Sequence, residues 1–571
     1  MERNIIYKYI TYGWIVFTIF LTTLRSSITY TDAMMYLGGL CCLFIIFISF
    51  IKKHKTIHLS YSDIIVLLWC VYTLIQGYIE SSAHCGSIMA SCTLLTSLYI
   101  CFRKLFSNDF SKPKDYEIAL IIIVATYIEL CIGIFQIYRG TSFHEGQLVT
   151  GSFFNSGPYS AFLMMGMVAA ICFLHFKYHT FFPKHIRKII KMMCIILLVL
   201  GASAFGVTMS RAAIITFTGI TLYIFYDKYK TYRKLCFSLF VLLSIICIVL
   251  IYIKYPSAIG RVIVWYFCLK LFFSNFIFGV GLGNFQKSYA QMMCDINQKS
   301  NHSTFVNYYA QIDYSYCDIL QIGTEQGMIG FVFCVILFSI LLIGLHRKSH
   351  ILFFTCLSLI IFSLSSYIFH LLPFQIIITV LMAWNVNTDR IHIHISKINM
   401  YTLYVAGLLI NLFTTKIIYY KVCGINEFLK YNGSGFSIKE YKNLYSSCQE
   451  IPNYYINYAE ALRKEHRYLD SNAILREGLN VSGDPNLYNM IGDNYKDMKF
   501  YTEALKSYQK AFYMLPNRLT PLFSIMKLYK IIGDKNQAQK YAIKVCLFHP
   551  KVSSYITREM KDEAYNELNK N

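Results

Sequence analysis

Long apolar runs recur through the first 420 of the 571 residues. Each has about 17–23 residues, enough to cross a ~30 Å hydrocarbon core as a helix. They lie near 9–24, 33–51, 62–80, 86–102, 117–138, 158–176, 190–207, 212–226, 235–253, 328–345, 350–369, 371–387 and 400–420. A chain with 56% hydrophobic and 15% charged residues could not keep a solvated surface. The sequence therefore predicts an all-α, polytopic membrane protein with about 12–13 transmembrane helices. The first run lacks a cleavage-site pattern, so we interpret it as a retained anchor.

Basic residues mark one side of these spans, because they gather in alternate short loops. They are Arg3 and Lys8, then Lys52, Lys53 and Lys55, then Arg103, Lys104, Lys112 and Lys114, then Lys177, Lys184, Arg187 and Lys188, then Lys228, Lys230, Arg233 and Lys234, then Arg347 and Lys348, and finally Arg390 and Lys397. The other loops hold almost only Arg25, Arg139 and Arg211. Short basic loops stay cytoplasmic. The N-terminus is therefore predicted to be cytoplasmic, and the long loop 255–327 and the C-terminal tail are predicted on the outer side.

The net charge of +22 does not indicate nucleic-acid binding, because the basic residues form short clusters between spans. They do not form a continuous basic stripe with aromatic residues between the charges. Most of the nineteen cysteines lie in apolar spans, where cysteine acts as a small hydrophobe. No zinc-type spacing occurs. Cys294 with Cys317, and Cys423 with Cys448, form disulfides if the outer side is oxidising, a point that spacing alone does not decide.

The composition changes after Lys421 to a polar, helix-periodic sequence that repeats itself. Tyr495, Ala504, Ala511 and Pro516 recur as Tyr529, Ala538, Val545 and Pro550, at a period of about 34 residues. This pattern resembles the tetratricopeptide repeat (TPR), an α-solenoid in which small residues lie where two helices touch. We therefore divide the chain into a polytopic domain (1–399), a final transmembrane helix (400–420) and a TPR-like domain (421–571), with an ordinary helical bundle as the alternative for the tail.

The loop 255–327 is too long for a simple connector, and long loops of this kind are usually functional. Arg261 lies near its start, in a segment apolar enough to form an interfacial helix. Arg211 opens the eighth span at the same outer boundary. For each arginine alone, the simpler interpretation is a snorkelling anchor, in which the charged side chain only extends to the membrane surface. Together they suit a phosphate-bearing headgroup, because guanidinium stays charged and binds phosphate bidentately.

Two polar segments near this boundary are candidates for binding the rest of a substrate. FGVGLGNF (278–285) has closely spaced glycines that permit close backbone approach, and it contains Gly281 and Asn284. GSFFNSGPYSAF (151–162) offers Asn155 and Tyr159. A plain turn is the alternative for the first segment, and it is not a dinucleotide fingerprint because no strand flanks it.

Two carboxylates follow in DILQIGTEQGMIG. Asp318 and Glu325 are seven residues apart, so they share one face of a helix. Either could act as a general base toward a hydroxyl. The alternative is a charge that complements a helix N-terminus. No DxD pair occurs on the outer loops, so no metal is expected.

These segments in this order resemble the O-antigen ligase and O-antigen polymerase family of bacterial membrane proteins, in the version with a C-terminal TPR array. The resemblance rests on GSFFNSGPYSAF, SRAA (210–213), GRVIVWY followed by GVGLGNF, and DILQIGTEQGMIG. It implies a membrane glycosyltransferase of the bacterial inner membrane, with the loop and tail periplasmic. It would move a glycan from a polyprenyl-pyrophosphate carrier to an acceptor hydroxyl, without metal or nucleotide cofactor.

The resemblance also implies roles for individual residues. Arg211 and Arg261 take the positions of the pyrophosphate-binding arginines. The acceptor-activating histidine of well-known ligases falls on Tyr316, and a tyrosine with a pKa of about 10 is a poor base at neutral pH. Asp318 or Glu325 is then the expected base, with His302 and His144 as further candidates.

Several functions remain open at this point. The acceptor is lipid A core, a growing glycan or a protein hydroxyl, so ligase, repeat-unit polymerase and O-oligosaccharyltransferase share the same chemistry. A transporter of lipid-linked saccharide would use the same arginines without chemistry. Transporters often show repeated spans and broken helices, and the absence of such symmetry in the sequence favours the enzyme. A scaffold that recruits protein partners through its repeats would leave the arginines without a role.

Overall fold

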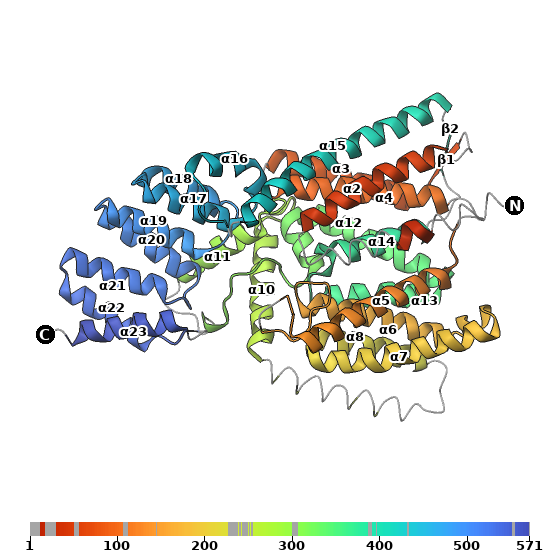
Figure 1. Ribbon diagram of the computed structural model, residues 1–571, viewed down its shortest axis with the longest axis horizontal. Helices are drawn as coiled ribbons and strands as arrows, with labels where there is room; N and C mark the ends of the chain where they lie inside the picture. The colour runs from red at the N-terminus through yellow and green to blue at the C-terminus, as the bar shows by residue number, and fades with distance from the viewer. Residues whose placement is uncertain are drawn as a thin grey trace.

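A computed structural model describes residues 12–16, 30–50, 56–80, 82–106, 112–143, 146–226, 255–299, 306–385, 391–394, 397–430, 433–550 and 554–569, with a few single positions between 238 and 252. The described chain is helical apart from two short strands (Figure 1). The first half of the bundle consists of α2 (Tyr30–Phe50), α3 (Tyr61–Glu80), α4 (Cys85–Phe106), α5 (Asp115–Arg139), α6 (Ser156–His175), α7 (Lys184–Thr208) and α8 (Arg211–Tyr226). The rest consists of α10 (Tyr255–Ser274), α11 (Phe285–Lys299), α12 (Asp318–Lys348), α13 (His350–Ser363), α14 (Leu372–Asn385) and α15 (Lys397–Lys430), with short 3-10 turns η1 (Tyr178–Phe181), η3 (Val306–Tyr308) and η4 (Ile368–His370).

Eight of the described helices are long and apolar enough to cross a membrane: α3, α4, α5, α6, α7, α10, α12 and α15. Four shorter apolar helices join them, within α2, α8, α13 and α14. The chain is therefore a multi-pass membrane protein. Each predicted span inside the described ranges falls on one of these helices, whereas the runs 9–24 and 235–253 lie largely outside the described residues.

Helix α6 is the centre of the bundle. Its sequence is rich in glycine, alanine and methionine, and most of its side chains are buried against α5, α7, α8 and α13. Gly166 shows why small residues are needed, because a Cβ there would lie 2.0 Å from Thr126 Oγ1 of α5. Close helix contact through small residues is the usual means of packing in a membrane, where hydrophobicity does not drive helices together.

A two-stranded antiparallel ribbon departs from the all-α prediction. Strand β1 (Thr56–Leu59) pairs with β2 (Ile391–His394), so segments far apart in the sequence meet at one end of the bundle. Figure 1 shows this ribbon at the end away from the C-terminal helices. Because β1 follows α2 and β2 precedes α15, the ribbon fixes the ends of both helices, which also pack along each other.

Helix α10 runs across the direction of the bundle helices (Figure 1). Its length and composition would allow it to span a membrane. Its exposed side chains include Val262, Tyr266, Leu269 and Phe273, which recur at helical spacing on one face. The opposite face buries Val264, Phe267, Cys268 and Leu271 against the loop that follows.

The last span and the start of the tail form one continuous helix. α15 runs without a break from Lys397 to Lys430, about 50 Å at 1.5 Å per residue. The boundary predicted at residue 421 is therefore not a break in the chain. Lys421 lies inside this helix and forms an ion pair with Glu450 of the tail, and Ser87 of α4 donates to the same carboxylate at 2.9 Å.

The tail consists of antiparallel helix pairs. After α16 (Ile438–Cys448) come α17 (Pro452–Lys464) with α18 (Tyr468–Leu479), α19 (Pro485–Asp497) with α20 (Tyr501–Met514), and α21 (Thr520–Ile532) with α22 (Lys535–Leu547), and α23 (Tyr555–Leu568) follows. Each pair begins with a helix that carries proline at its first or second position. Gly492 contacts the ring of Tyr508 so closely that a Cβ would lie 2.5 Å away. The tail is thus a set of helical repeats with small residues at the helix contacts.

The tail packs directly on the outer loop through α11. Asn297 Nδ2 donates to the carbonyl of Tyr513 at 2.8 Å, and Asn517 Nδ2 donates to the carbonyl of Tyr309 at 2.7 Å. Gly483 lets the tail backbone approach α11, because a Cβ there would lie 2.4 Å from Ala290 Cβ.

Neither predicted disulfide is formed. Cys294, Cys317, Cys423 and Cys448 are all free thiols. Two of the four hydrogen-bond to backbone carbonyls, Cys294 to Lys510 and Cys448 to Gly424.

Candidate functional site

The start of α12 places a carboxylate against a histidine that the sequence analysis missed. Asp318 Oδ1 lies 2.7 Å from His370 Nδ1, and its Oδ2 accepts from the backbone N–H of Phe369 at 3.0 Å. The Asp318 side chain is 1% exposed and the His370 side chain 28% exposed. Asp318 is thus closed off from a substrate, whereas the imidazole is accessible.

His370 has an altered proton affinity. Burial alone would lower its pKa, but the hydrogen bond and charge of Asp318, with the charge of Glu325, leave the pKa raised above its ordinary value. His370 lies in η4, between α13 and α14. Its Nδ1 is occupied by Asp318, so Nε2 is the atom left to exchange a proton with a ligand. This is the arrangement in which a carboxylate fixes a histidine's tautomer and orientation.

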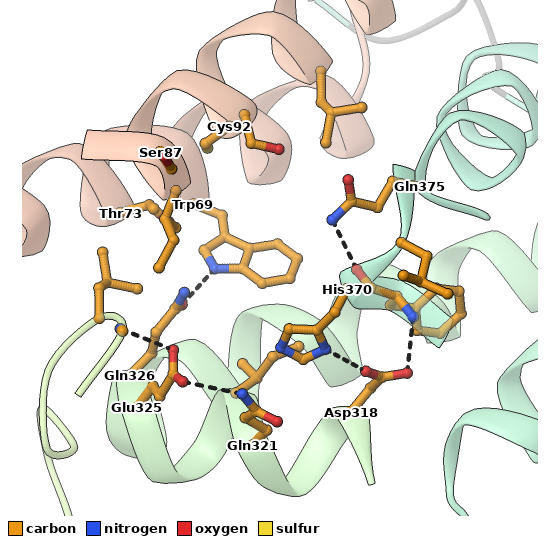
Figure 2. Close-up of a pocket in the computed structure, with 18 of the residues that line it drawn as sticks. Trp69, Thr73, Ser87, Cys92, Asp318, Gln321, Glu325, Gln326, His370 and Gln375 are labelled. Carbon is orange, nitrogen blue, oxygen red and sulfur yellow. Dashed lines mark hydrogen bonds and ion pairs between the residues drawn. The ribbon is translucent and has the colours of Figure 1, made fainter. Parts of the chain in front are cut away.

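His370 lines a cavity of about 560 Å³ between α3, α4, α12 and α14, within the size range of ligand pockets. Figure 2 shows Trp69, Glu325, Gln321 and His370 turned toward one another around it. The polar lining includes His84, Ser87, Gln286, Asp313, Tyr314, Asp318, Gln321, Glu325, Gln326, His370, Gln375 and Glu450. Asp318 and Glu325 line the same cavity, as expected for one helix face.

Glu325 is held by the glycine turn that precedes α11. The N–H of Gly283 donates to Glu325 Oε2 at 3.2 Å, and Gln321 Nε2 donates to Oε1 at 3.1 Å. Glu325 lies two turns inside α12 and two residues before the interruption of this helix at Gly327. The N-terminus that is near it is therefore that of the second helical segment, so a charge that complements a helix dipole stays an alternative for this residue.

The same glycine turn supplies hydrogen-bonding partners to α12 at the point where that helix is interrupted. Gly327 has φ 67°, which interrupts the helix. The freed carbonyls of Thr324 and Glu325 accept from the N–H groups of Val280 and Gly281 at 2.9 and 3.0 Å, and the N–H of Met328 donates to Phe276 at 2.8 Å. Irregular backbone is tolerated in a membrane protein only when its polar groups are satisfied in this way. The sequence analysis did not predict this break.

Gly281 and Asn284 therefore have structural roles that a substrate contact does not need to explain. Gly281 has φ 93°, and its N–H pairs with α12. Asn284 Nδ2 donates to the carbonyl of Val280 at 3.1 Å within the turn itself. Neither residue lines the cavity.

The two predicted arginines lie together near the N-terminal ends of α8 and α10. Arg211 Nη2 is 3.4 Å from Ser257 Oγ, and Arg261 Nη1 donates to the carbonyl of Ser365 at 2.8 Å. The two guanidinium charges are near enough to act on each other. No carboxylate pairs with either arginine within the described part of the chain. Two neighbouring cations without a counter-ion favour an anionic ligand.

Three tyrosines lie between the arginines and the cavity, and we call Tyr314, Tyr316 and Tyr367 the tyrosine partition. Arg261 Cζ is 5.4 Å from the ring centroid of Tyr316, a cation–π contact. Tyr367 stacks on Tyr314 at 4.5 Å and meets Tyr316 at 6.0 Å. Tyr314 in turn lies 4.9 Å from the His370 ring. The tyrosine partition therefore lies between Arg261 and His370 and contacts both residues.

Tyr316 is held in an uncommon conformation. Its φ of 56° lies in the left-handed region, which is rare for a bulky residue and clusters at functional sites. Burial raises its pKa, and the nearby Arg261 lowers it only in part, so the hydroxyl keeps its proton at neutral pH. Burial likewise raises the pKa of Tyr367 to about 12. Neither phenol is a base in the neutral range.

The remaining predicted residues lie in three different settings. Asn155 caps α6 by accepting from the N–H of Gly157 at 3.0 Å and also hydrogen-bonds Tyr367, so it borders the partition. Tyr159 is 1% exposed between α5 and α6, where no ligand reaches it. His144 and His302 lie outside the described residues.

Among the described residues, no group of three or more metal-ligating side chains lies close enough to hold an ion. The residues that do cluster are the two arginines, the tyrosine partition, and the pair of Asp318 and His370 that faces the cavity. No protein-family model matches the chain, and no curated protein matches it either.

Proposed function

We propose that the protein is a membrane glycosyltransferase that moves a saccharide from a polyprenyl-pyrophosphate carrier to an acceptor hydroxyl. The observation that carries the proposal is an arginine pair to which no described carboxylate is paired, with the tyrosine partition between it and an accessible histidine held by a buried carboxylate. The loop and tail are then on the outer side of a bacterial inner membrane, and the helical repeats are a TPR array. No metal or nucleotide is needed.

The donor occupies the arginine side. Arg211 and Arg261 bind the pyrophosphate, and the exposed apolar face of α10 lies in the interface, where a polyprenyl chain is at hand. As the bond between the anomeric carbon and the phosphate oxygen breaks, the pyrophosphate takes the electron pair. Fixed cations stabilise that developing charge, and electrostatic stabilisation of this kind is usually the largest single contribution to catalysis.

The acceptor occupies the cavity side. The acceptor oxygen attacks the anomeric carbon while its proton passes to His370 Nε2. Asp318 is a positioning residue, because its carboxylate is buried and acts through the imidazole. This proposal assigns the role of base to His370, whereas the sequence alone led us to expect Asp318 or Glu325. Glu325 lies on the same wall, where it accepts from further acceptor hydroxyls.

The first test uses purified protein in lipid nanodiscs with a polyprenyl-pyrophosphate-linked oligosaccharide and a panel of acceptors. Release of carrier pyrophosphate is followed together with the saccharide product. Acceptor-dependent release that is lost in Arg211→Ala and Arg261→Ala but kept in Arg139→Ala, an exposed arginine at the end of α5, supports the transferase. A product ladder indicates a polymerase, and a single step indicates a ligase or an O-oligosaccharyltransferase.

A transporter of lipid-linked saccharide is the second candidate, because α12 is interrupted at Gly327 beside buried ionisable groups. Interrupted helices and ionisable residues within the membrane are typical of transporters. The two functions separate in proteoliposomes. A transporter moves the intact carrier lipid between leaflets with no release of pyrophosphate, whatever acceptor is supplied.

A further inference from the structure

The cavity extends well beyond His370. Along α4 its lining runs from Ser87 to Tyr99, a length of about 18 Å at 1.5 Å per residue. The end near Ser87 is polar, with His84 and Glu450 beside it. The other end is largely apolar and is lined by residues such as Leu95, Ile378 and Met382. A cavity with a polar and an apolar end matches an amphiphilic ligand better than a free sugar.

The polar end is acidic and lacks fixed positive charge. Among the residues that the structure describes, no lysine or arginine lines the cavity, whereas Asp313, Asp318, Glu325 and Glu450 do. Asp318 is paired with His370, and Glu450 with Lys421 from outside the lining.

The other two carboxylates have only neutral donors. Glu325 accepts from Gln321 and from the N–H of Gly283, and Asp313 accepts from Gln286 at 3.1 Å. Such carboxyl groups are hydrogen-bonding partners for hydroxyl groups, and in their ionised form they repel a second anion.

An aromatic platform stands beside these carboxylates. Trp69 lines the cavity, and its Nε1 donates to Gln326 Oε1 at 2.8 Å, which fixes the plane of the indole (Figure 2). A fixed indole offers an apolar face on which the C–H face of a pyranose ring packs.

We propose that this cavity is the acceptor site and that it takes an uncharged saccharide linked to an apolar group. The saccharide lies between Trp69, Glu325 and His370, and the apolar group lies toward Met382. The proposal rests on the proposed function in calling this ligand the acceptor. It excludes acceptors that carry phosphate or another anionic group near the reacting sugar.

Binding is tested without donor, so that no turnover is needed. The full chain is placed in lipid nanodiscs and titrated with decyl glucoside brominated near the glycosidic end of the chain. Bromine quenches tryptophan on contact, and Trp69→Phe reports the background from the other three tryptophans. Decyl phosphate and decylamine with the same bromination are the anionic and cationic comparisons.

The expected result is saturable quenching by the glucoside that is lost in Trp69→Phe, with an affinity at least about tenfold above that for the phosphate. In the double variant Asp313→Asn with Glu325→Gln, the ratio of glucoside affinity to phosphate affinity is expected to fall below about threefold. Asp295→Asn, an exposed carboxylate on α11 outside the cavity, leaves it unchanged. Both variants keep the side-chain shape, but Glu325→Gln loses one of the two acceptors that bind Gly283 N–H and Gln321 Nε2. Folding is therefore checked by the Trp69 signal without ligand.

Three outcomes overturn the proposal: equal or tighter binding of the phosphate, binding of the amine as tight as that of the glucoside, or no quenching that depends on Trp69. Failure of the proposed function is seen separately. In that case the glucoside binds as described, but no acceptor releases carrier pyrophosphate. If instead the donor turns over normally and the glucoside never reaches Trp69, the function stands and the acceptor binds elsewhere.

Discussion

The two sides of the tyrosine partition differ in charge, in exposure and in how the chain builds them. The arginine side is formed by the first turns of α8 and α10, and its cations are half-buried at the bundle's edge. The acidic side is formed by an interrupted helix and a glycine turn, and its carboxylates line a cavity. One side is suited to an anion that leaves, and the other to a hydroxyl that loses a proton. The comparison teaches that cations for a leaving group and a base for a nucleophile can come from different elements of the fold, with aromatic rings between the two sets of side chains.

The largest expected effect comes from removing the cation at the centre of the arginine side. Arg261→Ala is expected to lower acceptor-dependent transfer by about 10³-fold, because the pyrophosphate loses a fixed cation as its charge develops. Carrier-lipid release in nanodiscs measures this, with Arg139→Ala as the control. A variant that keeps transfer within about threefold of the wild type would remove Arg261 from the donor site.

The next effect isolates the acidic side. His370→Gln is expected to lower transfer by about 10²-fold, since the acceptor loses its base. Binding of inorganic pyrophosphate, measured by calorimetry, is expected to stay unchanged because the arginines are untouched. If His370→Gln weakens pyrophosphate binding as strongly as Arg261→Ala does, the two sides are not separate sites.

A pH profile tests the coupling of Asp318 to His370. The raised pKa of His370 means that neutral imidazole appears only as pH rises above about 6.5, so transfer is expected to increase through that range. Asp318→Asn removes the charge that raises the pKa of His370, and the midpoint of the pH profile is expected to move to lower pH. An unchanged midpoint in this variant would show that Asp318 has only a structural role.

The same pair gives a stability test with the opposite dependence on pH. A group whose folded-state pKa is raised stabilises fully below its unfolded value, about 6.5 for histidine, and loses that contribution as pH rises through the folded value. The melting temperature of the wild type is therefore expected to fall over this window, and that of Asp318→Asn to fall less. Equal slopes would argue against a charged pair.

The smallest effect concerns the partition itself. Tyr316→Leu removes the ring beside Arg261, and such contacts are worth about 0.5–1 kcal/mol. Pyrophosphate affinity is expected to fall by about two- to fivefold, and glucoside quenching at Trp69 to stay the same. A loss on both sides would mean that the partition is a shared structural wall and not a boundary of the donor site.

The fold was predictable where it depends on long apolar runs. The segments now seen as α2 to α8 and α12 to α15 each carry enough consecutive apolar residues to identify them. The break at Gly327 was not predictable, because a glycine inside such a run does not disclose its φ. The pairing of β1 with β2 was missed for a related reason, since two four-residue segments more than three hundred residues apart carry no signal of contact.

The site was predictable in part. Asp318 and Glu325 were identified by their spacing, and Arg211 and Arg261 by their position at the outer boundary. His370 was missed because it is a single ionisable residue between two apolar segments and has no carboxylate near it in the sequence. Its only signal was that an ionisable side chain at that depth needs a partner. Gly281 was identified as special for the right physical reason, close backbone approach, but its partner is α12, and Asn284 bonds to Val280 within the turn.

The contact between α11 and the tail has a consequence for synthesis of the protein. Asn297 of the outer loop bonds to a carbonyl 216 residues further along the chain. At about 5–20 residues per second, the ribosome adds that partner some ten to forty seconds later. During this interval the loop that carries the glycine turn has none of its contacts with the tail. The loop therefore reaches its final arrangement only after the ribosome has synthesised the tail residues that contact it.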